Sequence, residues 1–174
     1  MSRFTHPDEL VCVTLLANKE GVDFTNLGRR IAGAFGDLLS TNYDDNRLFL
    51  YEGQFPAADT VNRLKGELKK RGIPVFAEFD HEENAKAAGL ELRPTTVVVF
   101  GSPKVGTSLM QEDQSIALEL PLKIAVWEDE AGSTWLGFLK MAAAAEAYGL
   151  KNHPVVGKMQ SLLEELVRAA GSIY

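Results

Sequence analysis

The segment FGSPKVGTSLMQ, residues 100–111, has the residue types of a phosphate-binding loop. The Walker loop needs glycine, four residues, a second glycine, lysine and then serine or threonine. Gly101 and Gly106 have this spacing, but Thr107 occupies the place of the lysine that reaches the β- and γ-phosphates. Pro103 also lacks the backbone N–H that would contact phosphate. These two departures exclude a P-loop nucleotidase.

A weaker anion site remains possible at the same loop. If a helix begins at Thr107, its free N–H groups and dipole favour an anion, and Lys104 supplies a positive charge nearby. The alternative is a tight turn in which Gly101 and Gly106 allow close packing and Thr107 only caps the helix. The sequence leaves both interpretations open.

His81 is the best candidate for proton transfer. Histidine is the side chain that most often serves as a general acid or base, and Glu128 is available as a second proton carrier. The neighbouring acids Asp80, Glu82 and Glu83 suggest a metal site. Adjacent residues seldom converge on one ion and no second histidine has ligand spacing, so we expect no metal. The alternative role for His81 is a hydrogen-bonded residue at a strand end.

Two further basic residues lie close to the loop motif in sequence, Arg93 and Lys123. On a strand over residues 122–129, Lys123 shares a face with Trp127, so it could contact a ligand carboxylate while the indole packs the apolar part. The alternative is that the lysine stem simply lies along the ring.

The elements that must position these residues follow from periodicity and from Gly and Pro signals. We expect an N-terminal βα extension, residues 1–46, with a strand at 10–17, a helix near 23–38 and a turn at 42–46. A second domain, residues 47–174, follows. Its predicted strands are 47–51, 74–80, 95–100, 122–127 and 134–138, and its predicted helices are 56–71, 82–88, 107–112, 140–148 and 155–170. The continuously apolar strand at 95–100 predicts cover on both faces. The order indicates an α+β fold with helices on a mainly antiparallel sheet.

Composition limits the partners and the compartment. The chain has 174 residues, a net charge of −6 and a pI near 5.1, which argues against a nucleic-acid partner. The basic residues of 63–71 read as the polar face of a helix. Its single cysteine, Cys12, suits a reducing compartment, and neither a signal peptide nor a membrane span is apparent. We therefore expect a cytoplasmic protein that binds neither membrane nor nucleic acid.

Three ordered segments resemble a known family. They are residues 87–96 (AAGLELRPTT), the loop at 100–111, and residues 118–129 (LELPLKIAVWED). Together they are similar to the domain-of-unknown-function family 302, over about residues 49–138. The resemblance implies a β-α-β4-α arrangement in the group of folds similar to the TATA-binding-protein half, often dimeric. It implies no chemistry, and fold likeness alone does not predict DNA binding.

Three functions remain as hypotheses. The favoured one is a domain that binds a small anionic ligand at residues 101–111, through Arg93, Lys104, Gly106, Thr107 and Lys123. The second is an enzyme without cofactor or metal, with His81 and Glu128 as proton carriers. The third is a dimeric interaction module with no small ligand. We expect a homodimer.

Overall fold

The computed structural model describes residues 47–173. The strand, helix and turn expected within residues 1–46, and with them Cys12, lie outside the described residues.

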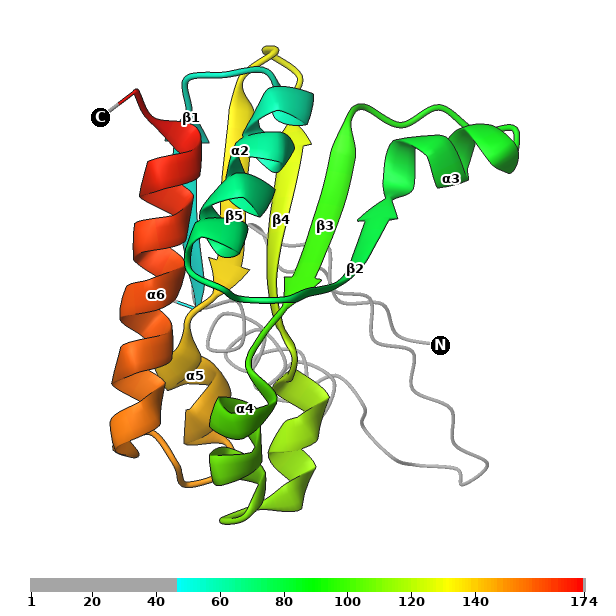
Figure 1. Cartoon of the computed structure of the whole chain (residues 1–174). Helices are drawn as coiled ribbons and strands as arrows, with labels where there is room; N and C mark the ends of the chain where they lie inside the picture. The colour runs from blue at the N-terminus through cyan, green and yellow to red at the C-terminus, as the bar shows by residue number, and fades with distance from the viewer. Residues whose placement is uncertain (1–46, 174) are drawn as a thin grey trace, which may run out of the picture. The chain divides into compact units, whose positions relative to one another are not determined.

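A five-stranded sheet forms the centre of the fold (Figure 1). All neighbouring strands are antiparallel, and their order across the sheet is β1-β5-β4-β3-β2. The strands are β1 (Leu48–Gly53), β2 (Val75–Asp80), β3 (Thr95–Phe100), β4 (Leu122–Glu128) and β5 (Thr134–Leu139). The predicted α+β fold with an antiparallel sheet and covering helices is confirmed.

Two long helices, α2 (Ala57–Lys70) and α6 (Pro154–Gly171), lie side by side on one face of this sheet. Pro56 precedes α2, and Gly72, with a φ of 65°, follows it, as the sequence predicts. The shorter helices are α3 (His81–Ala87), α4 (Pro103–Met110), α5 (Met141–Glu146) and a 3-10 helix, η1 (Gln114–Glu119), which the sequence did not predict.

The core lies between the sheet and these two helices. Alternate strand residues point into it, because successive side chains of a strand face opposite sides. Val98, Ile124 and Leu136 from the strands are completely buried there, as are Leu64 of α2 and Leu166 of α6.

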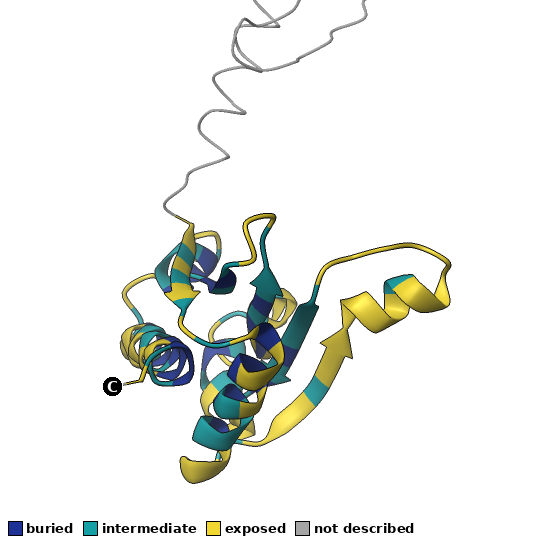
Figure 2. Ribbon diagram, turned by 90° about the horizontal axis from the view of Figure 1, so that it is seen from above, coloured by how far each residue is buried: buried dark blue, intermediate teal, exposed yellow. Residues whose placement is uncertain are grey.

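The opposite face of the sheet is largely open (Figure 2). The prediction that β3 is covered on both faces is wrong, because Val97 and Val99 are only half-buried while Val98 is completely buried. At the two edges of this face Leu50 is 51% exposed and Phe79 is 48% exposed. An apolar run predicts a strand but does not say which side the helices cover.

The basic helix α2 corrects a second expectation. Lys69 and Lys70 are exposed on its polar face, as predicted. Arg63, in contrast, is part-buried. Its Nε donates to the carbonyl oxygen of Ala170 (2.9 Å), and its Nη2 donates to those of Ala169 (3.2 Å) and Ser172 (2.7 Å). The residue therefore binds the C-terminal end of α6, where helix carbonyls lack partners within the helix.

Asp129 fixes the turn between β4 and β5. Its Oδ1 accepts from the N–H groups of Ala131 and Ser133, both at 2.9 Å, and its Oδ2 accepts from Trp135 Nε1 at 2.7 Å. The Trp135 hydrogen bond, followed by that of Ser133, lowers the pKa of Asp129 below its ordinary value of 3.8. A lowered pKa means that the ionised carboxylate stabilises the fold.

We expect Asp129→Asn to lower the free energy of unfolding at pH 7. The stabilisation is complete above the ordinary pKa of 3.8 and is lost as the pH falls through the lower pKa of the folded state. The difference between wild type and variant should therefore narrow below pH ~4, as urea unfolding between pH ~3 and ~7 would measure. Glu130→Gln, at a neighbouring exposed side chain, is the control. A difference that is independent of pH would contradict this role.

Candidate functional site

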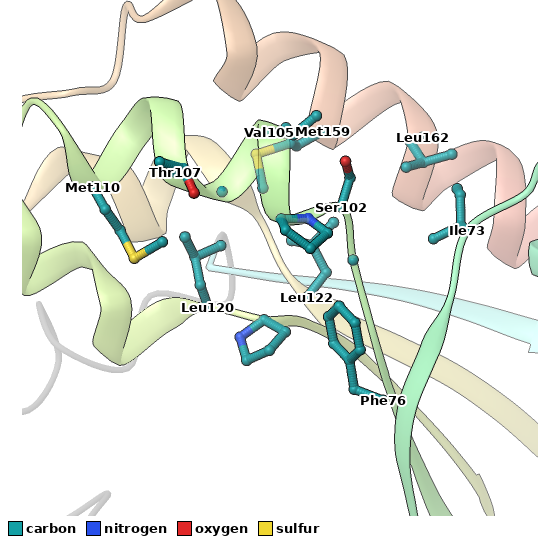
Figure 3. A pocket seen from close by; sticks show the side chains of 14 residues that line it. Ile73, Phe76, Ser102, Val105, Thr107, Met110, Leu120, Leu122, Met159 and Leu162 are labelled. Atoms are coloured by element: carbon teal, nitrogen blue, oxygen red, sulfur yellow. The ribbon is translucent and has the colours of Figure 1, made fainter.

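A cavity of about 230 Å³ lies where the end of β3 meets the first turn of α4 (Figure 3). Four segments distant in sequence enclose it: the start of β2, the loop and helix after β3, the start of β4, and the middle of α6. Its lining residues are Ile73, Phe76, Gly101, Ser102, Pro103, Val105, Gly106, Thr107, Met110, Leu120, Pro121, Leu122, Met159 and Leu162. The loop singled out from the sequence therefore forms one wall of a cavity.

The two glycines of the loop leave room for this cavity. A Cβ atom on Gly106 would lie 3.6 Å from Leu120 Cδ1 and 3.9 Å from Met110 Cε, which is ordinary contact, so a longer side chain there would extend among these lining residues. A Cβ on Gly101 would lie 3.4 Å from the Phe76 ring. The loop thus approaches its neighbours closely without filling the space between them.

The cavity is apolar with a polar rim. Met159 and Leu122 are buried at its wall, and Met110, Leu120 and Leu162 are half-buried. The hydroxyl-bearing residues Ser102 and Thr107 are exposed. Such a lining suits an apolar group held by van der Waals contact, with few polar groups to orient it.

The start of α4 corrects the sequence-based account of the loop. The helix begins at Pro103, with Ser102 as its N-cap, and not at Thr107. Pro103 fits the first helical position because its missing N–H has no partner to lose there. The N–H groups of Val105 and Gly106 both donate to the carbonyl oxygen of Ser102, each at 3.0 Å. Thr107 therefore lies inside the helix and is not its cap, and the N–H groups that the sequence assigned to a helix start at Thr107 do not lie at the start of this helix.

The five predicted ligand-binding residues fall into different places. Gly106 and Thr107 line the cavity, and Lys104 is exposed in the same helical turn. Arg93 lies before the opposite end of β3 and its Nη2 is 3.6 Å from Glu130 Oε1. Lys123 follows the cavity-lining Leu122 and therefore points to the other face of the sheet, where it is exposed. The structure brings three of the five together.

His81 and Lys104 do not share a site. His81 is the exposed first residue of α3, which adjoins the start of β3, whereas Lys104 follows the end of β3. Six strand residues separate the two ends, about 20 Å. Glu128 is the last residue of β4 and lies at the end of the strands where α3 also lies. Within residues 47–173, no group of three or more His, Cys, Asp or Glu side chains is placed to hold a metal ion.

The family follows from comparison with known proteins. Residues 51–169 match the family described as "Domain of unknown function DUF302". The chain belongs to the DUF302 family. The resemblance predicted over about residues 49–138 is confirmed, and the match also covers most of α6.

A solved DUF302 protein has the same fold. The crystal structure of an uncharacterised conserved DUF302 protein from Bacillus stearothermophilus matches with a TM-score of 0.65 at 20% identity. The match covers 71% of this chain and 98% of that one. At this identity the likeness concerns the fold alone.

Curated relatives carry a functional name. A protein of Brucella suis biovar 1 named "Fluoride-specific ion channel FluC 1" is 39% identical over 106 residues, which are 61% of this chain and 42% of that protein. Proteins of Brucella abortus and Brucella melitensis with FluC names match at the same identity over 39% of their length. This chain thus spans about two fifths of these relatives. Among residues 47–173 of this DUF302 protein, no helix is long and apolar enough to cross a membrane.

Sequence reasoning missed most of the cavity wall. Ile73, Phe76 and Leu120 are apolar residues between proline and glycine signals, and Met159 and Leu162 look like ordinary positions of an amphipathic helix. The sequence holds no signal that marks these residues, and the 49% exposure of Phe76 is visible only in the structure.

Proposed function

We propose that this DUF302 domain binds a small anionic ligand whose apolar part occupies the cavity beside α4. The observation that carries the proposal is the apolar cavity lined by the Gly101–Thr107 loop. Its volume, about 230 Å³, lies somewhat below the ~300–1,000 Å³ typical of small-molecule sites, so the ligand is compact.

The charge of the ligand is inferred from the rim. Lys104 provides a positive charge in the first turn of α4, and the positive end of the helix dipole lies at the same place. The hydroxyls of Ser102 and Thr107 are available as donors. A short-chain carboxylate has the required apolar body and anionic end.

The names of the Brucella relatives suggest a second candidate, a module that serves a fluoride channel. The supporting observation is the 39% identity over 106 residues to proteins that are more than twice as long as the shared stretch. Under this second candidate function, the small anion that the domain binds is fluoride. We further propose that the domain works in the cytoplasm as a homodimer.

A side chain that fills the cavity should weaken the binding of an anion with an apolar chain. We expect Gly106→Leu to weaken binding of octanoate by about tenfold or more, equal to about 1.4 kcal/mol, because the leucine side chain enters the space of the ligand. Gly66→Leu is the matched control, since Gly66 also lies within a helix and a Cβ there meets nothing within 4 Å. Isothermal titration calorimetry measures both.

Three probes separate the candidates. Octanoate binding that exceeds 1-octanol binding, with the difference removed by Lys104→Ala, supports the anionic ligand. Equal binding of octanoate and 1-octanol would support the cavity as a binding site but contradict the role proposed for the Lys104 charge. Saturable binding of sodium fluoride, unaffected by Gly106→Leu, favours the fluoride candidate. Octanoate binding that Gly106→Leu leaves intact would place the site elsewhere.

A further inference from the structure

The open face of the sheet carries mainly apolar side chains. All five strands contribute alternate residues to this face, and the strand pairings place these residues side by side. The apolar residues on it are Leu48, Leu50, Ala77, Phe79, Val97, Val99, Ala125, Trp127, Trp135, Gly137 and Leu139. No helix of the described part of the chain covers them, and contiguous apolar surface of this kind marks an interaction site.

Side chains pack closely around Gly137 on this face. A Cβ on Gly137 would lie 2.9 Å from Leu50 Cδ2 and 3.0 Å from two carbons of the Trp127 ring, so both side chains close over the glycine. Trp135 is held by its hydrogen bond to Asp129 at 2.7 Å. Tryptophan is among the residues that are enriched where binding energy concentrates in interfaces.

The charges on the face favour a second copy as the occupant. Among residues 47–173 the ionisable side chains on it are one acid, Glu52, and one base, Lys123. The whole chain carries a charge of −6, so two copies repel each other over most of their surfaces. The neutral face is where they can approach, and a two-fold interface can place the acid of each copy near the base of the other.

The area supports the same occupant when the neighbouring arm is included. Five strands of six to seven residues form a face of about 24 Å by about 20 Å, which is roughly 480 Å² per copy in projection. A typical stable interface buries about 800 Å² per partner, so the sheet face alone is too small. The remainder is available on the arm formed by α3 and the loop to β3, which lie beyond the five strands. The arm stands off the edge of the sheet, apart from α2 and α6 (Figures 1 and 2).

The arm itself lacks internal support. None of the seven residues of α3 is buried, and the loop after it exposes Leu90 (67%) and Leu92 (47%). A helix of this length has little stability of its own in water, so packing against another surface must hold it. A partner placed on the open face lies beside the arm.

We propose that two copies of this chain pack through their open sheet faces, from Leu50 at one edge across Trp127 to Phe79 at the other, and that the arm of each copy extends the contact. This inference rests on the proposed homodimer and names its surface. The cavity beside α4 is lined from the opposite, helix-covered side of the sheet, and stays accessible in the dimer.

Sedimentation velocity of the full chain across a concentration series tests the surface. Leu50→Asp should raise the dimer dissociation constant about 100-fold or more, because the interface then buries an unpaired carboxylate. Phe79→Asp, at the opposite edge of the face, should have the same effect. Leu118→Asp is the matched control, since Leu118 is 78% exposed but lies on η1 away from this face. Circular dichroism shows that each variant is folded.

The possible outcomes test the proposed surface and the proposed homodimer separately. Dissociation by both face variants and not by Leu118→Asp supports the proposal. A wild-type dimer that survives both face variants keeps the homodimer but overturns its surface. A wild-type chain that is monomeric at all concentrations overturns both.

Discussion

Replacing Gly171 with alanine is expected to destabilise the domain by about 1–3 kcal/mol, the usual range for overpacking a filled site. Gly171 is the buried last residue of α6. A Cβ there would lie 2.9 Å from Tyr51 Cε1 and 3.0 Å from Leu136 Cδ1. The backbone cannot easily withdraw, because the Gly171 carbonyl accepts from the Gln54 N–H at 2.7 Å. Either the ring or the helix end must move.

The same substitution elsewhere in α6 should have the opposite sign. A Cβ on Gly157 meets nothing within 4 Å, so Gly157→Ala should stabilise the domain by about 0.5–1 kcal/mol through higher helix propensity. Urea unfolding of both variants measures the contrast. Equal effects at the two positions would show that the end of α6 is not packed against β1 as tightly as described.

Replacing Arg63 with methionine is expected to cost about 2–3 kcal/mol. Methionine keeps an apolar stem but removes the three hydrogen bonds to the carbonyls of Ala169, Ala170 and Ser172. It also removes the guanidinium that lies 4.0 Å above the centre of the Phe55 ring. Charged hydrogen bonds contribute about 1.5–3 kcal/mol each at most, and their loss here is not additive.

Two companion variants identify the cause. Arg63→Lys should recover little stability, because an ammonium cannot bind several carbonyls in the fixed geometry of a guanidinium. Lys69→Met, on the exposed face of the same helix, should change the free energy of unfolding by no more than about 0.5 kcal/mol. Thermal unfolding measures all three. A fully stable Arg63→Lys variant would indicate that charge alone, and not the guanidinium geometry, holds the end of α6.

The sequence predicted the elements well where local signals are strong. Pro56 and Gly72 bounded α2 closely, and the turn at Gly132, with a φ of 81°, marked the β4–β5 hairpin. The start of α4 was wrong by four residues, because Pro103 was read as part of a loop when it holds the first helical position. A proline or glycine locates the end of a helix only when its position in the helix or loop is assigned correctly.

The candidate site was less predictable than the fold. Gly106 and Thr107, which the sequence singled out, line the cavity, but the apolar character of the cavity comes from Phe76, Leu120 and Met159. These three residues meet only through the tertiary fold, so no spacing in the chain reveals them. Arg93 and Lys123 were grouped with the loop by their nearness in sequence, and the pleat and length of the strands separate them.

The pairing of β1 with β5 has a consequence for how the protein is made. Leu48 pairs with Leu139, about 90 residues later in the chain. At about 5–20 residues per second, a ribosome needs roughly 5–18 seconds to supply that partner strand. During this interval β1 and the apolar side of α2 emerge without the strands and helix that later bury them. A newly made chain is therefore most prone to aggregate before its synthesis reaches β5, and a chaperone that binds extended apolar segments would protect it during that time.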